Sequence, residues 1–183
     1  MNGRGLVIDC GQLEPDQVTG QVELDRVDRL LLTHFHRDQC GAAAEWMRKG
    51  TAVSIPFSEK RFFEEGELLR ASYDTYDNYT AYYPTFSALE DIEGEPITDY
   101  DSVLWQGIVF QAIPLPGHTF GSTGYLFELD GRRFLAVGDV MAAPGGTEPA
   151  HAMGQPGRGQ ARLGIAETLA DTTQHIVRAN AQI

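Results

Sequence analysis

The seven residues Thr33–Gln39, Thr-His-Phe-His-Arg-Asp-Gln, constrain this chain more than any other stretch. They follow an apolar run, Arg29–Leu32, that predicts a buried strand. The strand therefore ends in two histidines, His34 and His36, with Asp38 two residues further on. Imidazole and carboxylate groups that project from one tight turn are suited to hold a metal cation. The sequence thus predicts a metal-binding turn at the end of a strand.

Two later segments carry further candidate ligands. Residues 116–119 read Pro-Gly-His-Thr, and residues 134–139 read Phe-Leu-Ala-Val-Gly-Asp, a second apolar strand that ends in a carboxylate. A His-x-His pair by itself is more often a surface pair than a metal site, but these contexts together favour metal binding. The candidate ligands are His34, His36, Asp38, His118 and Asp139.

The order of these motifs resembles the metallo-β-lactamase superfamily. The signature of that family is H-x-H-x-D-H after a strand, a P-G-H-T-like turn, a G-D strand end and a last histidine near the C-terminus. Residues 7–11, Val-Ile-Asp-Cys-Gly, are also similar to the early strand of the family, and the resemblance extends over roughly residues 5–180. This sequence departs from the signature in two places. Gln39 stands where the family usually has histidine, and no histidine follows His175.

The resemblance implies an α+β fold, the metallo-β-lactamase-like αββα four-layer sandwich. The length of 183 residues suits one domain, which we expect to extend over residues 1–183. The strand at residues 6–9 leaves little room for strands before it, and one expected helix precedes the end of the chain. We therefore expect the sandwich to be incomplete at its N- and C-terminal ends.

An acidic, aromatic insertion is expected at about residues 57–101. This segment contains twelve Asp and Glu residues but only three Lys and Arg residues. Tyrosines recur at helical spacing in it. One interpretation is an amphipathic helix that buries an aromatic face in the core. The other is a lid over the site, since such insertions vary between relatives of one fold. The tyrosines are Tyr73, Tyr76, Tyr79 and Tyr83.

Periodicity and turn residues predict the remaining elements. Gly50 should stop one helix, Ser58 should cap another, and Asp130-Gly131 should form a two-residue hairpin turn. The predicted strands are 5–9, 29–33, 51–55, 108–113, 124–129 and 133–138; the predicted helices are 41–49, 59–70 and 161–180, with a loop at 144–160.

The resemblance implies that His34, His36 and His118 hold zinc and leave one position open for water, which the cation activates. It implies that Asp139 bridges to a second metal, which Asp38 also binds. Gln39 offers only an amide oxygen, a poor zinc ligand beside imidazole. We therefore expect one zinc per chain, with iron or a second metal as the alternative.

The function that these features predict is a metal-dependent hydrolase of an ester, thioester, amide or phosphoester. Asp139 stands where antibiotic-cleaving members often have cysteine, which favours the group that includes thioesterases of the glyoxalase II kind. The candidate catalytic residues are Asp38, as water-orienting group or general base, and Asp139. One alternative is a mononuclear iron oxidoreductase of the persulfide dioxygenase kind, with His34, His118 and Asp139 as ligands. The other is a metal-binding member without catalysis.

Composition excludes several partners. The net charge is −12, which disfavours nucleic acid and anionic membranes, so a small-molecule substrate is expected. No apolar stretch reaches the length of a membrane span, and no signal peptide is visible, so a cytoplasmic location is the expectation. The sequence leaves the oligomeric state open. Its two cysteines, Cys10 and Cys40, are predicted core residues, with a thiolate ligand as the alternative for Cys40.

Overall fold

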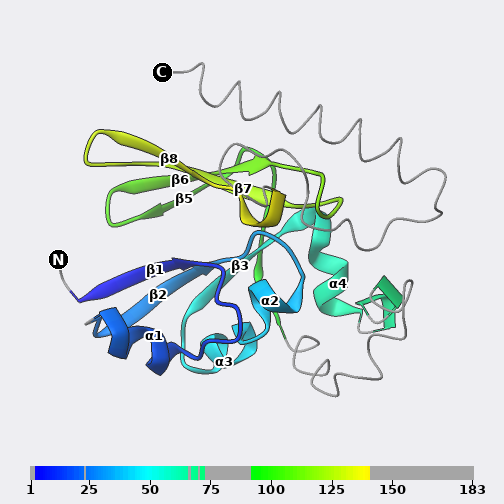
Figure 1. Cartoon of the computed structure of the whole chain (residues 1–183), viewed down its shortest axis with the longest axis horizontal. Helices are drawn as coiled ribbons and strands as arrows, with labels where there is room; N and C mark the ends of the chain where they lie inside the picture. Colours follow the sequence, from blue (N-terminus) through cyan, green and yellow to red (C-terminus); the bar gives the residue numbers. More distant parts are fainter. Residues whose placement is uncertain (1–2, 23, 66, 70, 73–91, 141–183) are drawn as a thin grey trace. The chain divides into compact units, whose positions relative to one another are not determined.

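The computed structural model describes residues 3–22, 24–65, 67–69, 71–72 and 92–140, and every structural statement below concerns these residues (Figure 1). The predicted loop at 144–160 and the predicted helix at 161–180 lie outside them. So do the tyrosine stripe and residues 73–91 of the predicted insertion. The chain divides into two compact units, which end and begin at Ile97 and Thr98.

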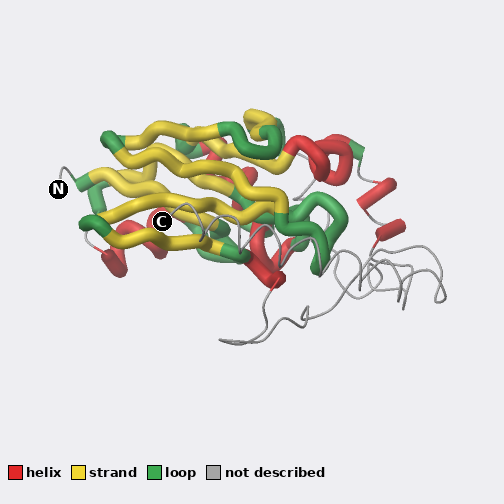
Figure 2. Tube along the Cα trace, turned by 90° about the horizontal axis from the view of Figure 1, so that it is seen from above, coloured by secondary structure: helices red, strands yellow, loops and turns green. Residues whose placement is uncertain are grey.

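The first unit contains a parallel sheet in the order β1-β2-β3-β4, whose strands run side by side (Figure 2). Parallel strands are buried on both faces and read as continuous apolar runs. Leu30–Leu32 shows this pattern, since all three side chains are fully buried. The run therefore forms a buried strand, as the sequence predicts. The strands are β1 (Arg4–Ile8), β2 (Arg26–Leu31), β3 (Ala52–Pro56) and β4 (Glu95–Ile97).

Short helices connect these strands. Helix α1 begins with proline at its first position, where the missing N–H costs nothing, and the sequence pattern does not predict this helix. The predicted helix 41–49 is the shorter helix α3, after which Gly50 has φ +85°, and the sequence pattern does not predict α2, which lies before it. In Figure 1, α1 and α3 lie beside the strands β2 and β3 that they contact. The helices are α1 (Pro15–Val22), α2 (Arg37–Cys40) and α3 (Ala43–Arg48).

The segment after β3 differs from its prediction. Ser58 does not cap a helix; it lies inside a 3-10 turn, η1 (Phe57–Glu59), which leads into helix α4 (Lys60–Glu64). Pro56 lacks an N–H and fixes its own φ, so the chain leaves the strand in a tight turn. The turn directs the side chain of Glu59 inward, where it is buried.

The second unit contains an antiparallel sheet in the order β5-β6-β7-β8. The hairpin between β7 and β8 turns at Asp130 and Gly131, whose φ values of 52° and 71° suit the predicted two-residue turn. Gln106 and Gly107 form a similar turn between β5 and β6, with φ values of 46° and 83°. The elements are β5 (Ser102–Trp105), β6 (Ile108–Pro114), β7 (Thr123–Leu129), β8 (Arg132–Ala136) and η3 (Gly138–Val140).

Strand ends hold the chemically interesting residues. In the first unit, Asp9 follows β1, His34 follows β2 and Glu59 follows β3. Neighbouring parallel strands end at the same edge of a sheet, which is where binding sites of such sheets occur. In the second unit, His118 lies between β6 and β7 and Asp139 lies just after β8.

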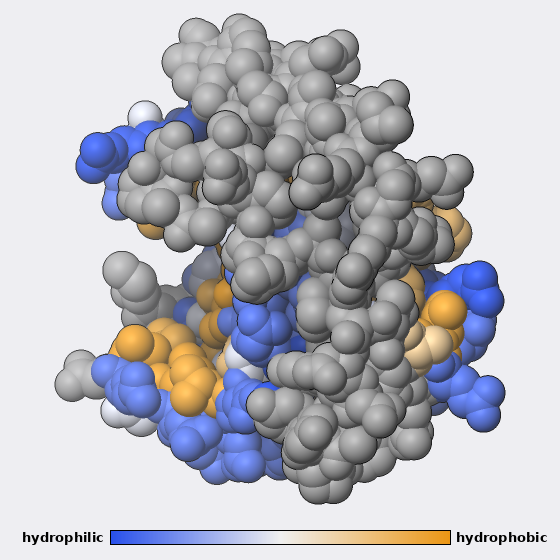
Figure 3. All heavy atoms as spheres, turned by 45° about the vertical axis from the view of Figure 1, so that its right-hand side comes forward, coloured by the Kyte–Doolittle hydropathy of each residue, from blue (hydrophilic) through white to orange (hydrophobic). Residues whose placement is uncertain are grey.

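The surface carries both polar and apolar residues. On the face drawn in Figure 3, apolar patches lie between hydrophilic ones. Single exposed apolar residues such as Leu104 and Phe120 are common on soluble domains. Among the described residues, no helix combines the length and the apolar character that crossing a membrane requires.

Candidate metal centre

His34 and His36 extend from the turn that follows β2. Both side chains are buried, and their ring centroids are 4.7 Å apart at an interplanar angle of 80°. Helix α2 begins directly after them at Arg37 and fixes the exit of the chain from the turn. Two buried imidazole groups are thus held side by side.

A hydrogen-bonded chain from β1 orients His34. The backbone N–H and the hydroxyl of Thr33 donate to the two carboxylate oxygens of Asp9, each over 2.8 Å. Thr33 Oγ1 also lies 3.0 Å from His34 Nδ1. The hydroxyl has one proton and gives it to the carboxylate, so Oγ1 accepts the proton of Nδ1. His34 Nε2 then carries a lone pair, which is the form of the ring that binds a cation.

Asp9 has a backbone conformation that few residue types adopt readily. Its φ is +56°, in the left-handed region that aspartate tolerates better than most side chains. This conformation places the carboxylate where it can bond both polar groups of Thr33. A local strain in the turn after β1 therefore accompanies the orientation of the histidine after β2.

His118 lies in a loop of the second unit, residues 117–122, that is held by its own hydrogen bonds and is called the pinned loop below. Thr119 N–H donates to Ser122 Oγ over 3.1 Å, and the two hydroxyl oxygens lie 2.6 Å apart. The N–H of Gly117 donates to the carbonyl of Thr119 over 3.0 Å. His118, Thr119 and Ser122 are all buried. The loop is thus internally cross-linked on both sides of the histidine.

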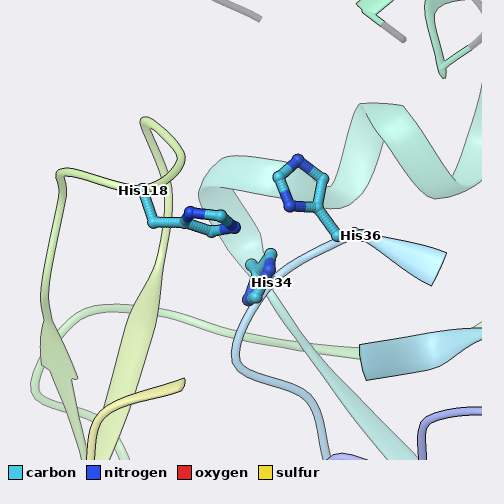
Figure 4. A group of neighbouring side chains, drawn as sticks. All are labelled: His34, His36 and His118. Carbon is cyan, nitrogen blue, oxygen red and sulfur yellow. The ribbon is translucent and has the colours of Figure 1, made fainter. Parts of the chain in front are cut away.

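The three histidines form one group of candidate ligands. Each of His34, His36 and His118 offers one nitrogen, and these atoms all lie within 4.8 Å of one another. Figure 4 shows the three rings gathered around a common space. His34 Nε2 and His118 Nδ1 are buried nitrogen atoms for which the described residues supply no hydrogen bond. Buried polar atoms ordinarily have a partner, so a three-imidazole site for a transition metal fits this arrangement.

The two predicted acidic ligands, Asp139 and Asp38, lie outside the group of three histidines. Asp139 is 29% exposed, and its Oδ2 lies 3.7 Å from His118 Nε2. This is too long for a hydrogen bond but short enough for both groups to contact one cation. Asp38 is exposed on α2, and the amide nitrogen of Gln39 lies 3.4 Å from its Oδ2. Neither aspartate belongs to the three-histidine group among the described residues.

The two cysteines are buried thiols, as the sequence predicts. Burial raises the pKa of Cys10 to about 12, with the nearby Asp9 carboxylate acting in the same direction. Burial also raises the pKa of Cys40 well above its usual range, and the nearby acidic groups Cys10, Asp9, Glu59 and Asp38 act in the same direction. The Cys40 thiol donates to the carbonyl of Phe35 over 3.1 Å. Cys40 therefore packs and hydrogen-bonds as a neutral thiol.

Sequence reasoning missed the residues that support the ligands. The sequence predicts Asp9 only as part of a family-like strand and predicts no role for Thr33 or Ser122. One signal was available for Asp9: a carboxylate at the end of a strand that neighbours the ligand strand meets the same edge of the sheet. Ser122 lies four residues beyond its histidine, and only the folded loop shows the contact.

Comparisons with known proteins identify the family and the fold of this chain. The family model of the metallo-beta-lactamase superfamily matches residues 2–169. A hydroxyacylglutathione hydrolase of Aeromonas hydrophila is 28% identical over 141 residues, which cover 76% of this chain and 43% of that protein. The chain thus spans less than half the length of this curated relative.

Solved structures match over more of the chain. The class B3 di-zinc metallo-beta-lactamase LRA-12 from an Alaskan soil metagenome gives a TM-score of 0.64 at 17% identity, over 93% of this chain and 63% of that one. A metallo-beta-lactamase from Cronobacter sakazakii, a mutant in a HARLDQ motif, gives 0.59 at 18% identity, over 92% and 64%. That motif ends in Asp-Gln, as the segment His34–Gln39 does here. The chain has the metallo-β-lactamase fold, and it belongs to the metallo-beta-lactamase superfamily.

Proposed function

We propose that this chain is a metal-dependent hydrolase that holds one zinc ion at His34, His36 and His118. The observation that carries the proposal is the approach of the three buried donor nitrogens to within 4.8 Å of one another. Zinc bound by three neutral imidazoles supplies a Lewis acid and activates water at neutral pH.

The protein groups around the cation have separate tasks. The Asp9–Thr33 pair keeps the Nδ1 proton of His34 engaged, so that Nε2 faces the site without a proton. The pinned loop holds His118 in one orientation. Fixed ligands of this kind lose little entropy on binding a metal, which favours a tight site.

Asp139 is the group we assign to the reaction itself. Its carboxylate lies within 3.7 Å of His118 and is partly open to solvent. A carboxylate in this position accepts a proton from the attacking water or orients that water toward the substrate. Asp38 is exposed and neighbours Gln39, so we assign it a secondary part in orienting water.

The substrate class that we propose is a small acyl thioester. The similarity to a hydroxyacylglutathione hydrolase supports it, because the name of that relative specifies a glutathione thioester. The net charge of −12 disfavours polyanionic substrates, since like charges repel on approach. A small, weakly charged acyl compound is compatible with both observations.

A substrate panel tests the proposal. The zinc-loaded protein would be assayed with a hydroxyacyl-glutathione thioester, a nitrophenyl ester, a bis-nitrophenyl phosphodiester and a chromogenic β-lactam. We expect the thioester to have the highest kcat/KM, and His118→Ala to lose that activity. Preference for the phosphodiester or the β-lactam would contradict the substrate class, and a zinc-loaded protein inactive on the whole panel would contradict the hydrolase.

Iron chemistry is the competing outcome. A mononuclear iron site would use His34, His118 and Asp139, and the 3.7 Å approach of the last two favours that set. Iron in the purified protein together with oxygen consumption on glutathione persulfide would replace the hydrolase by an oxidoreductase. Variant His36→Ala separates the two, because it removes a zinc ligand and spares the iron set.

A further inference from the structure

We propose that Glu59 is a positioning residue for the metal-binding turn: its buried carboxylate holds the backbone of Phe35 and thereby fixes His34 and His36 relative to each other. The inference rests on the metal-dependent function proposed above, and it concerns a residue outside the ligand set. Glu59 belongs to the turn η1 after β3, whereas the histidines follow β2.

The first observation is a buried hydrogen bond to a carboxyl oxygen. Phe35 is the residue between the two histidines, and its backbone N–H donates to Glu59 Oε2 over 2.7 Å. Glu59 is 1% exposed, although glutamate is among the residues least often fully buried. Burial of a carboxylate is costly unless hydrogen bonds compensate it. The carboxylate is therefore held at this position by a partner in the ligand turn.

The second observation is that further contacts converge on Phe35. Its carbonyl accepts a hydrogen bond from the buried Cys40 thiol over 3.1 Å. Its ring stacks on Phe62 of α4, with centroids 4.1 Å apart and an angle of 11° between the planes. Both polar backbone groups and the ring of Phe35 are thus fixed. Two of the three contacts come from the segment that begins with Glu59.

The contacts of Phe35 affect both His34 and His36 because Phe35 lies between the two histidines in the chain. The peptide groups on either side of Phe35 lead to His34 and His36, so rotation of either group would swing an imidazole out of the site. Asp9 fixes the start of the turn from the β1 side through Thr33. Glu59 fixes its middle from the β3 side. Loss of the second support should therefore change the affinity and the geometry of the metal site.

Two substitutions of Glu59 distinguish the effect of its hydrogen bond from the effects of its volume and its charge. Glu59→Gln keeps an oxygen that can accept the Phe35 N–H, whereas Glu59→Met keeps a similar volume and removes the acceptor. Zinc affinity would be measured by competition with a chelator, and site geometry by the visible spectrum of the cobalt(II)-substituted protein. We expect Gln to stay within about threefold of the parent and Met to bind zinc about 10–100-fold more weakly with a shifted cobalt spectrum.

Thr51→Val is the matched control. The Thr51 hydroxyl donates to the Val27 carbonyl over 3.0 Å, so this variant also removes a buried hydrogen bond from the first unit. It leaves the ligand turn untouched, and zinc affinity and the cobalt spectrum should not change. If Thr51→Val weakens zinc as much as Glu59→Met does, the effect is general destabilisation and the positioning role is wrong.

Glu59→Asp keeps the proposal testable if the Met variant does not fold. It retains the charge but withdraws the oxygen by about one C–C bond, roughly 1.5 Å. We expect it to bind zinc at least about fivefold more weakly than Glu59→Gln does. Parent-like zinc binding and cobalt spectra in both the Met and the Asp variants would overturn the inference. A parent protein that binds no metal would instead refute the proposed function.

Discussion

Replacing Asp9 with asparagine should reverse the hydrogen-bond chain that ends at His34. In the parent, the carboxylate accepts both the N–H and the O–H of Thr33. The amide of asparagine has one oxygen and one NH₂ group. If the oxygen stays on the Thr33 N–H, the NH₂ must face Thr33 Oγ1, and the hydroxyl must then donate to His34 Nδ1.

The substitution should weaken zinc binding because it moves the ring proton of His34 from one nitrogen to the other. A hydroxyl that donates to Nδ1 forces the proton of His34 onto Nε2, and a protonated Nε2 cannot bind a cation. If the amide flips instead, its NH₂ faces the buried Thr33 N–H, and an unsatisfied buried donor costs about 1–3 kcal/mol. Either arrangement should weaken zinc binding by about 10–100-fold, the usual range for a group that orients a ligand.

The assay compares parent, Asp9→Asn and Thr33→Ser. Zinc affinity would be measured by chelator competition, and the tautomer of His34 by nitrogen NMR of the apo protein. Serine keeps the hydroxyl, so Thr33→Ser should bind zinc nearly as the parent does. If Asp9→Asn retains parent affinity and an Nδ1-protonated His34, the proposed direction of the chain is wrong.

Three further predictions concern the cysteines and Gln39. Cys10 and Cys40 should react slowly with an aromatic disulfide reagent at pH 8 in the folded protein, and both should react at once in urea. Burial sets the folded pKa of Cys10 at about 12, and the unfolded thiol has a pKa of about 8.5. The unfolded chain then holds fewer protons between these values, so the free energy of unfolding should fall by about 1.4 kcal/mol per pH unit as pH rises. Urea titrations at pH 8 to 11 should show this slope reduced in Cys10→Ala, and an equal slope would contradict it. Gln39→His should add a second, weaker zinc-binding event in calorimetry, because an imidazole would join Asp38 and Asp139; identical titrations would show that residue 39 does not face the metal.

The sequence predicted the features that depend on local pattern. The apolar run at Leu30–Leu32 is a buried parallel strand, and the histidines follow its end. Asp130 and Gly131 form the hairpin turn because both tolerate positive φ. Gly50 ends α3 for the same reason. In each case the signal lies in a few neighbouring residues, either an apolar run or residues that tolerate positive φ.

Elements with weak local signals were missed. Helix α1 contains a glycine and few strong helix formers, and its start depends on Pro15 and on a hydrogen bond from Glu14 N–H to the Gln17 side chain. The turn at Gln106 was overlooked because glutamine is uncommon at positive φ. Short strands such as β4 are defined by their neighbours rather than by their own residues.

The supporting residues of the site were the hardest to predict. Glu59 is the first residue of the predicted helix 59–70, a position that acidic side chains favour. Its partner, Phe35, is 24 residues away in the sequence. Only the parallel alignment of β2 with β3 brings the two turns to one edge of the sheet. Pattern therefore identifies ligands, whereas the groups that orient them depend on strand order.

Metal stoichiometry tests the central claim most directly. The purified parent and His118→Ala would be analysed by mass spectrometry of the bound metals, alongside circular dichroism to confirm that both are folded. The account predicts one zinc per parent chain and no tightly held zinc in the variant, because two imidazoles do not complete the site. Two tightly bound metals per parent chain, or a variant that retains its zinc, would contradict it.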